Sequence, residues 1–310
     1  MSQNSYSQTI AQIKLVVALA LWGGSYIATK IALVDLSAGT LVWLRFLIGV
    51  LMLGWYARRQ GELRINSWKD AGQYIILGFI GITFHQWLQS TGLEITEAST
   101  TAWIVSTTPV FMVLMGWLFL REKIGWLGVG GILLAAAGVL LVVSRGDMGS
   151  LAGGDFGNPG DLLISISAPN WAFFSVLSRP ALKRDSPIKV TFFVIFFGWL
   201  LSSIPFFAGS GWQEFGRLSA QGWTSVLYLG VLCSSMAYIF YYDGLHHLPA
   251  SRVGAFLYLE PLFATLIAAL VLSEHIFLTT LLGGMLILLG VWLVEQTASR
   301  RDQSEPYAPE

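Results

Sequence analysis

Two uncharged apolar stretches decide the fold class of this chain. The first, Ile124–Val143, reads IGWLGVGGILLAAAGVLLVV, and the second, Ile276–Val294, reads IFLTTLLGGMLILLGVWLV. A helix needs about 20 mainly apolar residues to cross the hydrocarbon core of a bilayer, and both stretches come close to that length without one charged side chain. They predict two spanning helices in an all-α integral membrane protein.

The composition of the whole chain agrees with this prediction. Of its 310 residues, 55% are hydrophobic and 12% are charged, whereas soluble domains carry about a quarter charged residues. The formal net charge is zero, so the charge balance predicts no nucleic-acid partner. The single cysteine, Cys233, excludes a disulfide within the chain and a metal cluster built from thiolates. We therefore expect a lipid bilayer around the protein, and no metal or cofactor.

Ten stretches in all have the length and apolar character of a span. They are 15–34, 38–57, 71–91, 98–120, 124–143, 161–182, 190–209, 221–242, 250–272 and 276–295. The basic residues of the short loops follow the even-numbered spans, at Arg58, Arg59, Arg64, Lys69, Arg121, Lys123, Lys183, Arg184, Lys189, Arg252, Arg300 and Arg301. Because cytoplasmic loops carry the excess of Lys and Arg, we expect a multi-pass protein of the cell inner (plasma) membrane with cytoplasmic N- and C-termini.

The sequence also repeats itself at an offset of 152 residues. Gly78–Val142 aligns without a gap to Gly230–Val294, and 18 of the 65 pairs are identical, Pro109 with Pro261 among them. Self-similarity at a fixed offset indicates a structural repeat. Each half holds five predicted spans, and because five is odd the two halves must cross the membrane in opposite senses. Inverted repeats of this kind place a binding site at their interface, near the middle of the bilayer.

The repeat divides the chain into four parts. We expect a first five-helix repeat at 12–143, an external glycine-rich linker at 144–160, a second repeat at 161–296 and a disordered polar cytoplasmic tail at 297–310.

Short motifs in both halves resemble the EamA family of the drug/metabolite transporter superfamily. They are Trp22-Gly23-Gly24-Ser25 with Lys30, Arg45-Phe46, Gly92-Leu93 with Ala98 and Pro109, Arg121-Glu122, Trp171-Ala172 with Arg179, Leu259-Glu260-Pro261 and Ser273-Glu274. The resemblance implies a basket of ten helices in which helices 3, 4, 8 and 9 are central and helices 5 and 10 peripheral. It also implies export or exchange of amino acids, related metabolites or drugs.

Two prolines at equivalent positions are candidate hinges. Pro109 and Pro261 interrupt the predicted spans 98–120 and 250–272. Proline leaves the carbonyl four residues earlier without its helical partner, and in a bilayer such a carbonyl must be satisfied by protein or water. Paired interruptions in both halves point to a transporter site, and a packed kink without a ligand is the alternative.

Two charged residues inside predicted spans are candidate polar anchors or coupling residues. A charge such as Glu260 at the centre of a span costs about 2.5–3.5 kcal/mol on insertion scales, so it needs a partner, water or a proton. Glu260 either faces a cavity, with a role in cargo contact or proton coupling, or is a protonated or capped residue at the kink. Arg45 could attract a carboxylate substrate, pair with Glu260 or with a backbone carbonyl, or serve structure alone.

The remaining site candidates are aromatic, amide and imidazole side chains within the predicted spans. Small-molecule sites combine apolar walls with a few polar anchors, although Trp and Tyr also form belts at membrane interfaces. The candidate substrate-binding residues are Trp22, Tyr26, His85, Gln86, Gln89, Trp103, Asn170, Trp171, Tyr238, Tyr241 and Tyr258.

The sequence therefore predicts a secondary transporter that exports or exchanges small metabolites by alternating access. A channel or facilitator is the alternative. A membrane-embedded enzyme is disfavoured, because no carboxylate pair, Ser/His/Asp set or phosphate loop stands at a membrane face, and we assign no catalytic residue. The expected partners are a small-molecule substrate and the bilayer, for a monomer or a homodimer.

Overall fold

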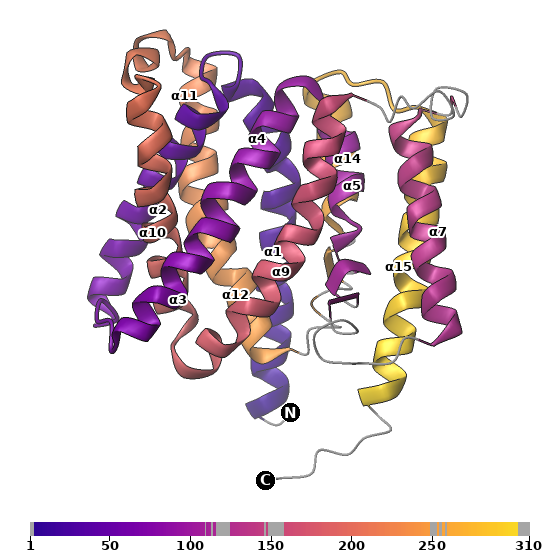
Figure 1. The fold of residues 1–310 in the computed structure, drawn as a ribbon, viewed down its shortest axis with the longest axis horizontal. Coiled ribbons are helices and arrows are strands. Elements are labelled where there is room, and N and C mark those ends of the chain that lie inside the picture. Colours follow the sequence, from indigo (N-terminus) through magenta and orange to yellow (C-terminus); the bar gives the residue numbers. More distant parts are fainter. Residues whose placement is uncertain are drawn as a thin grey trace.

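The computed structural model describes residues 3–108, 110–112, 114–115, 125–145, 147, 158–248, 253, 256–257 and 259–302. In these residues the secondary structure is entirely helical, and the helices stand side by side (Figure 1). The expected hinge Pro109 and the candidate binding residue Tyr258 lie outside the described residues.

The described helices fall into two series along the chain. The first half contains α1 (Gln3–Ala32), α2 (Ala38–Arg59), α3 (Trp68–Gly78), η1 (Phe79–Phe84), α4 (His85–Ile95), α5 (Ala98–Val105) and α7 (Trp126–Val143). The second half contains α9 (Pro159–Arg184), α10 (Pro187–Ala208), η2 (Gly211–Arg217), α11 (Ala220–Leu227), η3 (Tyr228–Ala237), α12 (Tyr238–His247), α14 (Leu259–Val271) and α15 (Leu278–Asp302). Every predicted span overlaps one of these helices or an unbroken run of them.

Four of the described helices are long and apolar enough to cross a membrane, by length and composition. They cover Thr9–Ala32, Ala38–Arg59, Pro187–Ala208 and Ala220–His247. Shorter apolar helices at Trp126–Val142, Leu259–Val271 and Leu278–Gly290 accompany them. The prediction of a disordered tail from residue 297 was wrong as far as Asp302, because α15 continues to that residue.

Side chains at the loop ends fix where several helices begin. Ser37 and Ser186 accept hydrogen bonds from backbone N–H groups in the first turns of α2 and α10. Asn158 and Asp161 form a reciprocal capping box at the start of α9. These contacts satisfy N–H groups that have no partner inside a helix.

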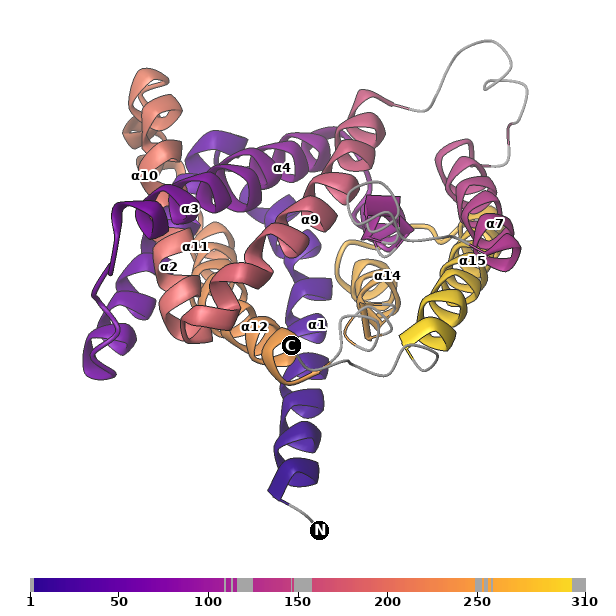
Figure 2. The same cartoon turned by 60° about the horizontal axis from the view of Figure 1, so that its bottom comes forward.

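The main core surrounds α1, whose Leu15, Leu19 and Trp22 pack with buried residues of α2, α10 and α12. The pair α7 and α15 stands to one side of this core in both views (Figures 1 and 2). Large apolar side chains such as Leu133 and Met285 are exposed on that pair. Exposed apolar surface on this scale is expected where lipid replaces water as the solvent.

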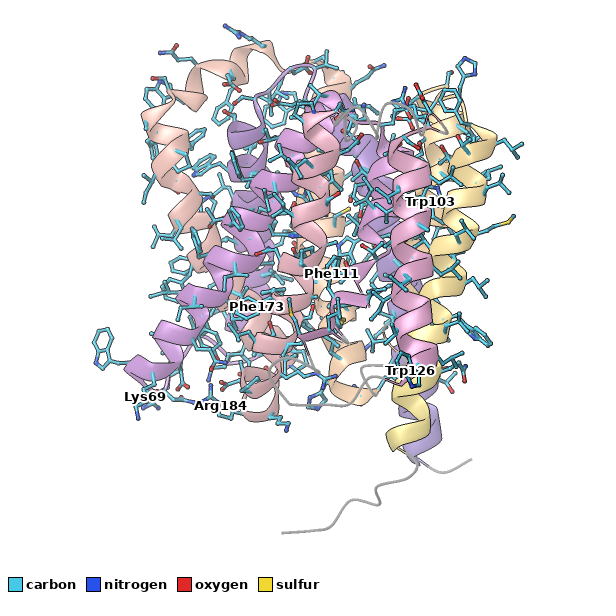
Figure 3. All side chains as sticks on the ribbon, turned by 45° about the vertical axis from the view of Figure 1, so that its right-hand side comes forward. Lys69, Trp103, Phe111, Trp126, Phe173 and Arg184 are labelled. Carbon is cyan, nitrogen blue, oxygen red and sulfur yellow. The ribbon has the colours of Figure 1, made fainter. Side chains whose placement is uncertain are left out.

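The ends of the molecule differ in charge. Lys69 and Arg184 lie at the same end as the start of α1 and the end of α15 (Figures 1 and 3). The loop between α1 and α2 lies at the opposite end (Figure 1), and it carries Asp35.

Candidate functional site

A narrow cavity of about 50 Å³ lies among α1, α2, α4, α5, α9, α12 and α14. Its lining comes from both halves of the sequence and consists of Trp22, Ser25, Tyr26, Arg45, His85, Gln86, Gln89, Ala102, Val105, Ser106, Thr108, Trp171, Tyr238, Leu257, Glu260 and Pro261. A volume of this size holds only a few water molecules. A larger solute therefore requires the cavity to widen.

Glu260 meets Tyr26 in the cavity wall. The Tyr26 hydroxyl donates a hydrogen bond to Glu260 Oε1 at 2.5 Å. Glu260 is buried, with only 8% of its surface exposed. Gly23 brings α1 close enough for the contact, because a Cβ atom at Gly23 would lie 2.7 Å from Phe263 Cβ and 3.0 Å from the Glu260 carbonyl oxygen. The glycine of the Trp-Gly-Gly-Ser motif thus lets α1 and α14 pack backbone to backbone.

Arg45 is buried on another part of the wall, with 4% of its surface exposed. Its Nε donates to Ser234 Oγ and its Nη1 donates to Gln86 Oε1, both at 3.1 Å. The guanidinium also lies 5.0 Å from the Phe46 ring. Ion pairs among the described residues do not include Arg45 or Glu260. The suggested pairing of Arg45 with Glu260 is therefore absent, and neutral side-chain oxygens hold the arginine.

Aromatic rings form the apolar part of the wall. The Trp22 ring lies 5.8 Å from Trp171 and 5.3 Å from Tyr238, measured between centroids. Its Nε1 donates to the Cys233 carbonyl at 3.2 Å. His85 packs 4.9 Å from Trp171, is 3% exposed, and has no hydrogen-bond partner at Nδ1. The wall thus combines edge-to-face aromatic rings with an unsatisfied imidazole nitrogen.

A π-helical segment precedes cavity residues in each half. Segment η1 leads into His85, Gln86 and Gln89, and η3 leads into Tyr238. Adding the repeat offset of 152 to residues 79–84 gives 231–236, which lies inside η3. Short π-helices are rare and occur frequently at functional sites. These segments could not be predicted from the sequence, because spans that are apolar almost all round show no periodic pattern for an extra residue to shift.

The predicted site residues fall into three groups. Those that line the cavity are Trp22, Tyr26, Arg45, His85, Gln86, Gln89, Trp171, Tyr238, Glu260 and Pro261. Three others point elsewhere. Trp103 packs with residues of α7 and α15, Asn170 donates to the Ile80 carbonyl at 2.9 Å, and Tyr241 is buried with its ring 5.0 Å from that of Trp22. Tyr258 and Pro109 belong to the part of the chain that the structure does not describe.

Sequence reasoning missed several lining residues, most of them small. They are Ser25, Ala102, Val105, Ser106, Thr108 and Leu257. The repeat contained the signal for two of them, because Thr108 is equivalent to Glu260 and Ser106 to Tyr258 at the offset of 152. Residues equivalent to a predicted cavity residue were better candidates than isolated aromatic residues such as Trp103.

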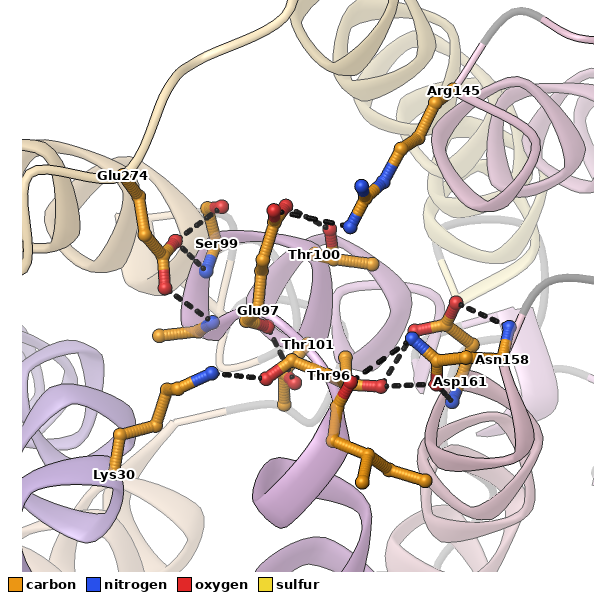
Figure 4. Close-up of polar contacts among 12 residues, drawn as sticks. Lys30, Thr96, Glu97, Ser99, Thr100, Thr101, Arg145, Asn158, Asp161 and Glu274 are labelled. Atoms are coloured by element: carbon orange, nitrogen blue, oxygen red, sulfur yellow. Dashed lines mark hydrogen bonds and ion pairs between the residues drawn. The ribbon is translucent and has the colours of Figure 1, made fainter. Parts of the chain in front are cut away.

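A polar cluster joins several helix ends at the face opposite the start of α1 (Figure 4). Glu274, which follows α14, accepts hydrogen bonds from the backbone N–H groups of Ala98 and Ser99 at 3.0 and 3.2 Å. It thereby caps the start of α5 with a carboxylate from the other half of the chain. Lys30 of α1 donates to the Thr96 carbonyl at 2.6 Å.

The same cluster includes the ends of α7 and α9. Arg145 pairs with Glu97 at 3.0 Å, and the Thr96 hydroxyl lies 2.7 Å from Asn158 Oδ1 and 2.8 Å from Asp161 Oδ1. Lys30 is one helical turn beyond the cavity residue Tyr26. The cluster therefore connects the elements of the cavity wall on the side toward this face.

Comparisons with known proteins extend this description. The model of the EamA-like transporter family matches residues 9–144 and 158–296. The chain belongs to the EamA-like transporter family. A relative from Archaeoglobus fulgidus, named as an uncharacterized transporter, is 28% identical over 280 residues, which are 90% of this chain and 95% of the relative. The uncharacterized transporter YetK of Bacillus subtilis is 26% identical over 309 residues, or 96% of this chain and 89% of YetK.

The fold of this EamA-like chain also occurs among solved structures. A crystal structure of a protein that is 21% identical superposes with a TM-score of 0.67 and covers 95% of this chain and 99% of its own. The family, the relatives named as transporters and the apolar helices indicate a multi-pass membrane transporter rather than an enzyme.

Proposed function

We propose that the protein is a secondary transporter that exports or exchanges small metabolites, namely amino acids, related compounds or drugs, by alternating access. It does so as ten membrane-spanning helices in two inverted repeats, with both termini in the cytoplasm. The observation that carries this proposal is the cavity, to which both halves contribute and into which two buried charged side chains face without pairing with each other.

Contacts between the halves support the inverted repeat. A Cβ at Gly138 of α7 would lie 2.6 Å from the Gly283 carbonyl oxygen of α15, and a Cβ at Gly290 of α15 would lie 2.5 Å from the Gly131 carbonyl oxygen of α7. Gly138 and Gly290 are 152 residues apart, as are Gly131 and Gly283. The two contacts are therefore a pair that a two-fold axis in the membrane plane would exchange.

The cavity lies close to such an axis. Gln86 Nε2 donates to the Tyr238 hydroxyl at 3.5 Å, and these residues are also 152 positions apart. Two equivalent residues can touch each other only near the axis that relates them. A site on the axis is reached equally from either side of the membrane when one repeat rocks against the other.

In an alternating-access cycle the cavity must be closed toward each side of the membrane in turn, and the polar cluster closes it toward one side. Its hydrogen bonds and ion pair join α1, α5, α7 and α9 to the segment after α14. The ion pair of Arg145 with Glu97 is partly exposed, and an exposed ion pair contributes about 1 kcal/mol or less, so this contact can form and break during a transport cycle. We propose that the cavity opens toward this face when the cluster separates.

Glu260 is the proposed coupling group. It is buried, it lines the cavity, and its contact with Tyr26 has no counterpart in the first half, where Thr108 stands at the equivalent position. Carboxyl groups buried in membrane proteins commonly take part in proton relays. We expect the Glu260→Gln protein to lose the pH dependence of transport, and an unchanged rate and pH profile would remove the coupling role.

Flux through vesicles containing the purified protein tests the function itself. Saturable counterflow of a labelled solute, accelerated by unlabelled solute on the other side, is the result expected of a carrier. A current that rises linearly with voltage would favour a channel, and chemical conversion of the solute would favour an enzyme. Because no solute is yet assigned, the assay begins with amino acids, nucleosides and cationic dyes that raise the melting temperature of the protein.

A further inference from the structure

Arg45 brings an uncompensated positive charge into the cavity wall. A guanidinium carries five N–H donors, and the hydrogen bonds of Arg45 go to two neutral oxygens, those of Ser234 and Gln86. Within the described residues no carboxylate lies within ion-pair distance of it. The guanidinium therefore has donors to spare at a cavity surface.

Such an arrangement is costly for structure alone. Burying a charge without a counterion is expensive, because the ion loses its hydration and gains no opposite charge. A neutral donor at position 45 could hold Ser234 and Gln86 at lower cost. The unused N–H groups of the guanidinium match the carboxylate of a bound solute, because two parallel N–H groups can bind its two oxygens.

Elsewhere the cavity wall offers hydrogen-bond acceptors. Glu260 has carboxylate lone pairs beyond the one that Tyr26 occupies, and His85 Nδ1 is buried without a partner. Arg45 and Glu260 line the same cavity without bonding to each other. A solute that fits both has a carboxylate at one end and an ammonium or hydroxyl donor at the other.

We infer that the cavity binds a small organic acid through Arg45, with the ammonium or hydroxyl group of the solute directed to Glu260 and His85. Gln86 and Ser234 then act as positioning residues that aim the guanidinium. This inference rests on the proposed function, because it identifies the cavity as the place where cargo binds.

Pairs of probes that differ only in the carboxylate test the inference. The purified protein is mixed with L-alanine or L-alaninamide, L-lactate or L-lactamide, and L-phenylalanine or L-phenylalaninamide, and its melting temperature is measured over a range of concentrations. The acids of at least one pair should raise the melting temperature saturably, and the matching amide should bind roughly tenfold more weakly or worse, as expected for a lost charge-assisted contact.

Two variants connect the effect to Arg45. Arg45→Gln should abolish the difference between acid and amide, while Arg64→Gln, which removes an exposed cation from a loop, should leave it intact. Gln86→Glu is the sharper variant, because it places a carboxylate beside Nη1, where the glutamine oxygen now lies at 3.1 Å. That internal anion should keep the protein folded, as seen in its melting temperature without solute, and should weaken the binding of the acid.

The outcomes separate this inference from the proposed function. Equal binding of acid and amide, no response to any acid, or undiminished acid binding in folded Gln86→Glu would overturn the carboxylate site. Saturable counterflow of an amide or amine, unchanged by substitution of Arg45, would also overturn the carboxylate site. It would nevertheless support the proposed transport function. The protein could also bind carboxylates in a way that depends on Arg45, while no solute shows saturable flux in vesicles. That result would support the carboxylate site and overturn the proposed transport function.

Discussion

At the scale of single residues, the contact between Tyr26 and Glu260 has a measurable energy. Hydrogen bonds to charged groups contribute about 1.5–3 kcal/mol in soluble proteins, whereas bonds between membrane helices average about 0.6 kcal/mol. We expect Tyr26→Phe to lower the free energy of unfolding by about 1–2 kcal/mol, because its hydroxyl is buried at 2.5 Å from the carboxylate. Unfolding of the detergent-solubilised protein, titrated with a denaturing surfactant, measures this difference in free energy.

The matched control for this substitution is Tyr56→Phe, which removes an exposed hydroxyl. A double-mutant cycle with Glu260→Ala isolates the pair, since Tyr26→Phe should cost much less once the carboxylate is gone. An equal cost in both backgrounds would mean that the hydroxyl contributes through some contact other than Glu260.

Asp35 gives a pH prediction in the loop between α1 and α2. Hydrogen bonds from the Ser219 hydroxyl and from the Ser219 backbone N–H hold the pKa of the Asp35 carboxyl below its usual value. A carboxyl whose folded pKa is lowered contributes stability above its unfolded pKa, near 3.8, and that contribution is lost as the pH falls through the folded pKa. Melting temperatures from pH 6 down to about pH 3 should therefore fall less in Asp35→Asn than in the native protein. Parallel curves would contradict this.

At the scale of elements, glycine determines how α7 meets α15. A Cβ at Gly138 would lie 2.6 Å from the Gly283 carbonyl oxygen and 2.8 Å from the Ile287 backbone nitrogen, and backbone atoms cannot move aside cheaply. We expect Gly138→Ala to destabilise the protein by about 1–3 kcal/mol, the usual cost of overpacking, with a lower melting temperature as the readout.

Gly130 on the same helix is the control for this substitution, because nothing lies within 4 Å of a Cβ built there. Gly130→Ala should be neutral or stabilise the protein by up to about 1 kcal/mol, since alanine favours helix. If both substitutions lower the melting temperature equally, close packing of α7 on α15 is not what Gly138 provides.

The elements also show why part of the site could not be predicted. The length of the apolar stretches and the 152-residue repeat can both be recognised in the sequence, and the positions of the helices were predicted from them. The direction in which a side chain points depends on helix rotation, which an almost uniformly apolar sequence does not specify. Trp103 therefore seemed equivalent to Trp22, although it packs with residues of α7 and α15 while Trp22 lines the cavity. The π-helices η1 and η3 add a further rotation at this point.

At the scale of the whole molecule, charge at the two ends predicts the orientation in the membrane. Lys69 and Arg184 share one end with the start of α1, and the loop with Val34 and Asp35 is at the other (Figures 1 and 3). Positively charged loops remain in the cytoplasm because translocating them is unfavourable. The native cysteine, Cys233, is fully buried, so a cysteine introduced at the surface is the dominant target for a thiol reagent.

Labelling of intact cells with a membrane-impermeant maleimide can therefore read this orientation directly. Val34 is 85% exposed, and we expect Val34→Cys to react in intact cells. Arg64→Cys, in the loop between α2 and α3, should react only after the membrane is permeabilised. The inverse pattern would reverse the topology and place the polar cluster in the cytoplasm. The polar cluster would then close the cavity toward the cytoplasm, and its separation would admit cargo for export instead of releasing it.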